Sequence, residues 1–165
     1  MRDDGVLLEG GRVAPAPALF LAAVANPSLR PLPLNLLQAR KKIAAGAQVL
    51  FTEPLWDAAG FAEWMKVLGG EGLHERVHIV ASVRPLKSAA QAEAMQKRHP
   101  SAGISDSVIA RLRKASDPAR EGIALCAELA AKAKETSGVH GIHFLTGGCD
   151  DALAPILQQA GLASA

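Results

Sequence analysis

The chain has 165 residues, of which 49% are hydrophobic and only 4% aromatic, so one domain with an aliphatic core is expected over residues 1–165. Eighteen basic and sixteen acidic residues give a net charge of +2, which offers no electrostatic case for binding nucleic acid. Two cysteines without paired spacing exclude a disulfide framework. No apolar run is long enough to span a bilayer, and the N-terminus lacks a signal-peptide core, so we expect a cytoplasmic protein without membrane contact.

The first half of the chain alternates short apolar runs with helical patterns. Gly46 and Pro27 interrupt the chain after a helical and an extended run respectively, and Asp57 is a plausible helix N-cap. In chain order we expect a loop with at most a short hairpin over residues 1–17, a buried parallel strand over 19–24, a helix over 34–45, a strand over 48–52 and a helix over 58–68.

The second half continues this alternation and adds helical segments. Ser88 is a predicted N-cap, and Asp117-Pro118 places a capping residue before a proline that suits the first helical position. We expect a strand over residues 77–83, a helix from Ser88 to about 98, a loop over 100–104, a helix from Ser105 or Asp106 to about 115, a long helix to 136, a strand over 141–146 and a helix over 150–160.

Four strand–helix units with one inserted helix predict an α/β fold with parallel strands and right-handed crossovers. Each strand is a continuous apolar run, which is typical of a sheet covered on both faces. Ligands of parallel α/β folds bind at the carboxyl ends of the strands. That rule selects Asn26, Thr52 with Glu53, residues 82–84, and Thr146 with the two glycines that follow it.

Glu53 follows a buried strand, where a carboxylate can hydrogen-bond a heterocycle or act as an acid or base; a solvated or salt-bridged Glu is the alternative. Arg84 and Lys87 together suit an anionic group such as a carboxylate tail or phosphate, and a solvent-facing basic loop is the alternative. The five histidines lack partners at metal-ligand spacing, so no metal site is predicted, and no triad, nucleophile elbow or phosphate-binding motif is present.

Eight short pieces occur in an order and at spacings that resemble the C-terminal half of methylenetetrahydrofolate reductases. The pieces are Met1-Arg2-Asp3-Asp4-Gly5, residues 42–47, Phe51-Thr52-Glu53, Pro85-Leu86-Lys87-Ser88, residues 104–112, Glu121-Gly122-Ile123, Gly141-Ile142-His143-Phe144 and Ala160-Gly161-Leu162. The resemblance implies four parallel βα units forming the C-terminal half of a (β/α)8 barrel, a fold that usually needs about 250 residues. It further implies FAD, a reduced nicotinamide, NADH or NADPH, and reduction of methylenetetrahydrofolate in one-carbon metabolism.

Residue by residue, the resemblance implies cofactor and substrate contacts. Ala22, Ala23 and Asn26 match a region that contacts the flavin. The helical residues Asn35, Gln38 and Lys42 match a face that reaches the adenylate or phosphate portion of the flavin cofactor. Thr52 and Glu53 match a Thr-Gln pair whose Gln contacts the pterin ring of folate, and Arg84 and Lys87 complete the substrate-binding set.

This chain departs from the family pattern in ways that bear on activity. Glu53 replaces the Gln, Arg84 replaces an apolar residue, Ser82 replaces a Gly and Asn26 replaces a frequent His. The first four strands, which hold the catalytic acid of the family, are missing, so no catalytic residue is assigned. A half barrel exposes two sheet edges and one face, and these must be covered. The cover is a separate N-terminal half-barrel partner, a second copy of this chain or a rearranged sandwich.

Three functions remain open. The chain is the C-terminal half of a flavin-dependent methylenetetrahydrofolate reductase-like enzyme, or a non-catalytic accessory module of folate or corrinoid metabolism that kept the scaffold. The third alternative is an unrelated α/β enzyme with a cleft at Glu53, Arg84 and Lys87 that turns over its substrate without flavin or folate.

Overall fold

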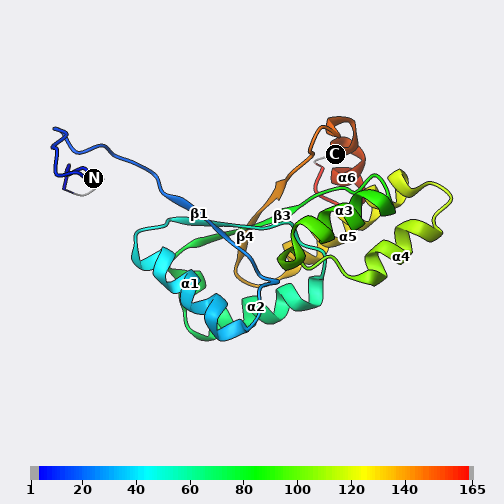
Figure 1. The fold of residues 1–165 in the computed structure, drawn as a ribbon, viewed down its shortest axis with the longest axis horizontal. Coiled ribbons are helices and arrows are strands. Elements are labelled where there is room, and N and C mark those ends of the chain that lie inside the picture. Colours follow the sequence, from blue (N-terminus) through cyan, green and yellow to red (C-terminus); the bar gives the residue numbers. More distant parts are fainter. Residues whose placement is uncertain (1–3, 164–165) are drawn as a thin grey trace.

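The computed structural model describes residues 4–163 and contains a four-stranded parallel sheet whose strand order, β1-β2-β3-β4, follows the chain (Figure 1). The strands are β1 Ala22–Ala25, β2 Val49–Thr52, β3 His78–Val83 and β4 Val139–Phe144. The first residues of the predicted loop and of the first family-like piece, 1–3, lie outside the described part, as do 164–165. The predicted parallel α/β fold is confirmed.

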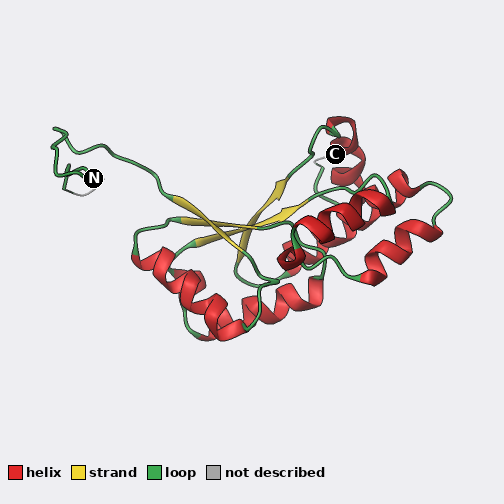
Figure 2. Cartoon of the chain, in the orientation of Figure 1, coloured by secondary structure: helices red, strands yellow, loops and turns green. Residues whose placement is uncertain are grey.

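Within residues 4–163, six α-helices connect and follow the strands. Figure 2 shows these helices beside the sheet. They are α1 Leu32–Ala44, α2 Ala58–Gly70, α3 Ala89–Arg98, α4 Asp106–Lys114, α5 Pro118–Glu135 and α6 Leu153–Gln159. Short 3-10 turns occupy Leu73–Glu75, Pro100–Ala102 and Asp150–Ala152. The second of these turns lies in the segment predicted as a loop, and the third forms the first turn of the predicted last helix.

Four predicted helix starts are confirmed by their capping hydrogen bonds. The first helix instead begins at Leu32 rather than residue 34 and has no side-chain cap. The Asp57 carboxylate accepts from the Ala59 N–H, Ser88 accepts from the Gln91 N–H and Asp117 accepts from the N–H groups of Ala119 and Arg120. Ser105, rather than Asp106, caps α4, because its hydroxyl accepts from the Val108 N–H. Short polar side chains thus satisfy amide groups that the first turn of a helix leaves unpaired.

The second and third strands begin one residue later than predicted, and the first and fourth differ more. The first begins at Ala22 rather than Leu19, because the Leu21 N–H donates to the Gln48 side chain, so regular pairing starts one residue later. The fourth begins at Val139 rather than residue 141, since Val139 already pairs with Ile79 before a register shift at Ile79/Val80.

Only one face of the sheet is covered by the helices of residues 4–163, as expected for half a barrel whose second face needs a covering element. Leu50, Ile79 and Ala81, all fully buried, pack in one cluster with side chains of α1 and α2. A second cluster joins Val83 to α3–α6. On the other face, Val24 is 51% exposed although it lies within a strand. We call this second side, which carries Val24, Phe51, Val80 and His143, the open face.

Residues 4–20 leave the body of the molecule as an extended segment (Figure 1). A single antiparallel bridge, Val6 to Arg12, is the short hairpin that the glycines predicted. Phe20, two residues before β1, is 66% exposed, so the run predicted as a buried strand is exposed at its beginning. No helix in residues 4–163 is long and apolar enough to cross a lipid bilayer.

Candidate functional site

A cleft lies at the carboxyl ends of the strands, where the sequence predicted a ligand site. Its volume is about 280 Å³. Loops after β1, β2 and β3 provide one wall, and the end of α3 with the segment after it provides the other. The lining includes Asn26, Glu53, Trp56, Arg84, Met95 and His99. We call it the Glu53–Arg84 cleft.

The backbone around Glu53 is fixed to both neighbouring strands. The Glu53 N–H donates to the Ala25 carbonyl on β1 over 2.7 Å, and the Leu55 N–H donates to the Ser82 carbonyl on β3 over 2.9 Å. These bonds fix the backbone of residues 53–55 across the end of the sheet. The exposed Glu53 side chain therefore projects into the cleft from a fixed backbone position.

The cleft contains two opposite charges that do not pair with each other. Within residues 4–163, neither the Glu53 carboxylate nor the half-buried Arg84 guanidinium has a hydrogen bond or an ion pair. The ion pairs of Arg111 with Glu121 and Glu128, by contrast, lie between α4 and α5, away from this cleft. Unpaired charges in a concave site are available to recognise a polar ligand.

Asn26 joins two walls of the cleft. Its side-chain amide donates to the Ser101 carbonyl over 2.9 Å, and its carbonyl oxygen accepts from the Ser28 N–H over 3.0 Å. The bond to Ser101 brings the 3-10 turn Pro100–Ala102 next to the end of β1, although the two residues are 75 positions apart. Asn26 therefore shapes the cleft, besides lining it.

A second hollow of about 270 Å³ lies beside the first, between β1 and α1, and shares Asn26 and Glu53 with it. It brings together Asn35, Gln38 and Lys42, the helical residues that the resemblance assigned to the flavin cofactor. The buried Asn35 amide donates to the carbonyls of Asn26 and Leu29. The Lys42 ammonium donates to the Val24 carbonyl over 2.5 Å, which leaves it two further N–H donors.

The four other predicted site residues lie outside both hollows. Thr52 is buried, and its hydroxyl accepts from the Ser82 N–H over 2.8 Å, which replaces a ladder bond between β2 and β3. Lys87 is exposed, and only its backbone N–H is bound, to the Gln91 side chain. Ala22 and Ala23 precede the residues of β1 that line the second hollow, Val24 and Ala25.

Sequence reasoning missed Trp56, Met95 and His99 as lining residues of the cleft. Trp56 follows the predicted strand end by four residues, so its place near the cleft was within reach of the strand-end rule. Met95 and His99 had no comparable signal, because tertiary contacts bring their segment to the sheet: Met95 packs against the cluster that contains Val83, and Asn26 bonds to Ser101.

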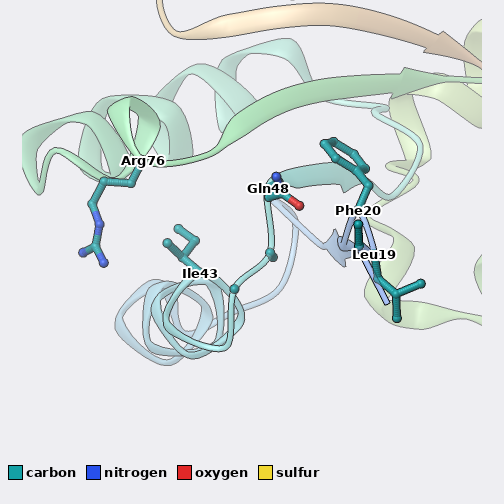
Figure 3. A pocket seen from close by; sticks show the side chains of 8 residues that line it. Leu19, Phe20, Ile43, Gln48 and Arg76 are labelled. Carbon is teal, nitrogen blue, oxygen red and sulfur yellow. The ribbon is translucent and has the colours of Figure 1, made fainter. Parts of the chain in front are cut away.

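A larger hollow of about 740 Å³ lies at the opposite ends of the strands, between Phe20, Ile43 and Arg76. Figure 3 shows the Arg76 side chain pointing away from Phe20 and Gln48, so the polar groups there do not converge. Within residues 4–163, no group of three or more His, Cys, Asp or Glu side chains is arranged to hold a metal ion.

Four parallel βα units with helices on one face of the sheet and a cleft at the carboxyl ends of the strands have the arrangement of about half of a (β/α)8 barrel. The profile of the methylenetetrahydrofolate reductase family matches residues 21–161, so the chain belongs to that family. No curated protein matches the sequence.

Among solved structures, the fold is similar to an uncharacterized protein from Clostridium thermocellum that binds two copies of 5-methyl-5,6,7,8-tetrahydrofolic acid. The TM-score is 0.67 at 15% sequence identity, and the match covers 90% of this chain. It covers only 54% of the other chain, so this chain spans about half the length of that protein. At this identity the similarity shows the fold alone.

Proposed function

We propose that this chain is one half of a folate-binding barrel and that the Glu53–Arg84 cleft binds the pterin. The observation that carries the proposal is the unpaired Glu53 carboxylate, held rigidly at the carboxyl end of β2 in a family whose members act on folates. A carboxylate accepts two parallel hydrogen bonds, which suits the adjacent N–H groups of an amino-oxo pyrimidine ring such as that of a pterin.

The second part of the proposal is that an N-terminal half barrel covers the open face. The similar Clostridium protein is about twice as long as the matched region, which supports a missing half of comparable size. The exposed Val24 on the open face and the exposed Phe20 just before β1 favour apolar contact with such a partner. A symmetric dimer of this chain is the alternative arrangement.

The completed barrel would bind FAD and reduce methylenetetrahydrofolate with NADH or NADPH. The second hollow supports this reading, because Lys42 keeps two free donors and Gln38 is exposed beside it, a combination that suits a phosphate or ribose of the cofactor. FAD, when bound, would supply the hydride for the reduction. This chain would contribute Glu53 as the group that orients the pterin, and the acid catalyst would come from the other half.

A second candidate is an accessory module that binds folate without flavin. Two residues assigned to the flavin already bond within the chain, which favours this candidate. The Asn35 amide donates to the carbonyls of Asn26 and Leu29, and the Lys42 ammonium donates to the Val24 carbonyl of β1. Measurement of native mass, flavin absorbance and methylenetetrahydrofolate reduction on the chain with its co-purifying partner separates the two. Stoichiometric flavin with reduction supports the enzyme, whereas folate binding without flavin supports the accessory module.

A further inference from the structure

Two half-buried rings meet on the open face although their strands are not neighbours. Phe51 lies on β2 and His143 on β4, with β3 between them. Neighbouring strands lie about 4.8 Å apart, so two strands separated by a third are about 10 Å apart. The ring centroids of Phe51 and His143 are nevertheless only 5.2 Å apart, edge to face. The two side chains therefore lean toward each other over β3.

This contact has the geometry of an interior layer in a (β/α)8 barrel. Such a layer consists of four side chains that alternate strands contribute. Since β2 and β4 are alternate strands of the sheet, Phe51 and His143 supply two of the four side chains. The other two must come from the strands that complete the barrel, so the chemistry of the layer depends on what covers the open face.

The ring of His143 is oriented by Ser82, its directly paired neighbour on β3. The Ser82 hydroxyl oxygen and His143 Nδ1 are 3.2 Å apart. Ser82 is fully buried, and its hydroxyl has no other hydrogen-bond partner within residues 4–163. Because a buried hydroxyl proton needs an acceptor, Ser82 donates to Nδ1, and the neutral ring carries its own proton on Nε2. No group in the same range of residues accepts from Nε2, so the open face presents a polar donor beside the ring of Phe51.

We infer that the N-terminal half barrel places a side-chain oxygen against His143 Nε2, and that this acceptor selects it over a second copy of the chain. The inference rests on the proposed half-barrel partner and adds the chemistry of one contact to it. A cover without an acceptor would leave the Nε2–H group buried and unpaired, which is costly.

A second copy of this chain is such a cover. It would complete the layer with another Phe51 and another His143, which are an apolar ring and a second donor. The similar Clostridium protein, by contrast, continues for nearly as long again as the matched region, which is enough for four further strands with side chains of different chemistry.

The test compares dissociation constants of the chain and its co-purifying partner, measured by analytical ultracentrifugation. His143→Leu removes the donor and leaves the oxygen of the partner buried and unpaired, so it should weaken assembly by about tenfold or more. His143→Gln returns an N–H group at a similar distance from the backbone and should assemble within about threefold of the wild type. His78→Leu is the matched control, because His78 is exposed at the amino end of β3, and it should change assembly by less than about twofold.

Nitrogen NMR of the wild-type assembly, labelled at histidine, gives a second measurement that needs no variant. The inference predicts a His143 ring with its proton on Nε2 and slow exchange of that proton with solvent. A proton on Nδ1 instead, or rapid exchange from Nε2 in the assembled protein, would contradict the paired donor.

Assembly of His143→Leu that is unchanged or tighter would overturn the inference, because a donor without an acceptor is better replaced by an apolar group. If that assembly still bound 5-methyltetrahydrofolate, the proposed pterin site would stand. Weaker assembly of His143→Leu, with no folate binding by the wild type, would uphold the inference and contradict the pterin site. A chain that purifies alone, as a monomer or as a symmetric dimer, would contradict both the inference and the proposed half-barrel partner.

Discussion

At Gly122, in its second turn, α5 packs directly against the backbone of the segment after β3. A Cβ built on Gly122 would lie 1.7 Å from the Leu86 carbonyl oxygen and 2.7 Å from its carbonyl carbon. Leu86 belongs to the segment after β3 that begins with Arg84, and it is fully buried. Because both contacting groups are backbone, neither can rotate away. Gly122→Ala is therefore expected to push α5 off the segment that carries the site.

The size of the effect follows from two opposing contributions. Side chains rarely bring a Cβ within 3.0 Å of another heavy atom, so α5 and the loop would have to separate by about 1.3 Å, the difference between 3.0 and 1.7 Å. Overpacking of this kind costs about 1 to 3 kcal/mol or more, while alanine gains about 1 kcal/mol over glycine in a helix. Because the overlap is severe, the overpacking cost lies at the upper end of its range, and we expect a net loss of about 2 kcal/mol, or roughly 4 to 8 °C in Tm.

Thermal unfolding followed by circular dichroism measures this loss, and Gly70→Ala is the control. Gly70 is the last residue of α2, and no heavy atom lies within 4 Å of a Cβ built on it, so alanine there should be neutral or stabilising by up to about 1 kcal/mol. The reasoning is refuted if Gly122→Ala melts at or above the wild-type temperature, because α5 would then not rest on the Leu86 backbone.

Three further outcomes are expected elsewhere in the chain. The bond to Arg111 lowers the pKa of Glu128 below its ordinary value of 4.5. The contribution of this ion pair to the free energy of unfolding is therefore complete above pH 4.5 and is lost as the pH falls through the lowered pKa. Glu128→Gln should therefore cost less than about 1 kcal/mol at pH 7, and denaturant titrations of the two proteins should converge in acid. Burial raises the pKa of Cys126 to about 12, so iodoacetamide at pH 8 should label the half-buried Cys149 and spare Cys126 until the protein unfolds, as peptide mass spectrometry would show. Val24→Asp should change Tm by less than about 2 °C but prevent assembly with the covering half in native mass measurements, and unchanged assembly would contradict the role of the open face.

The elements of this fold were predictable from local chemistry. Capping side chains at Asp57, Ser88 and Asp117 set the helix starts, and the bonds they make in the structure are those expected from short-range geometry. The bounds of the first and last strands were less accessible, because pairing partners determine them. A side chain of Gln48, far along the chain, takes the bond that would otherwise extend β1 to Leu21.

The site was predictable only in part. The strand-end rule identified Asn26, Glu53 and Arg84, which the structure brings into one cleft. The rule failed for Thr52, whose hydroxyl accepts a hydrogen bond from the Ser82 N–H between β2 and β3. Apolar periodicity does not reveal which polar side chains form hydrogen bonds within the sheet. Two of the family-like pieces, Pro85-Leu86-Lys87-Ser88 and Glu121-Gly122-Ile123, meet at the Leu86–Gly122 contact, so part of what carried the resemblance is packing.

The most direct test of the central claim is calorimetric titration of 5-methyltetrahydrofolate into the chain with its co-purifying partner, compared with Glu53→Ala and Glu53→Gln. Truncation to alanine removes both acceptors and should weaken binding by about tenfold or more, whereas glutamine keeps one acceptor and should retain binding to within a few-fold. Binding that is unaffected by Glu53→Ala, or absent from the wild type, would contradict the assignment of the Glu53–Arg84 cleft as a pterin site.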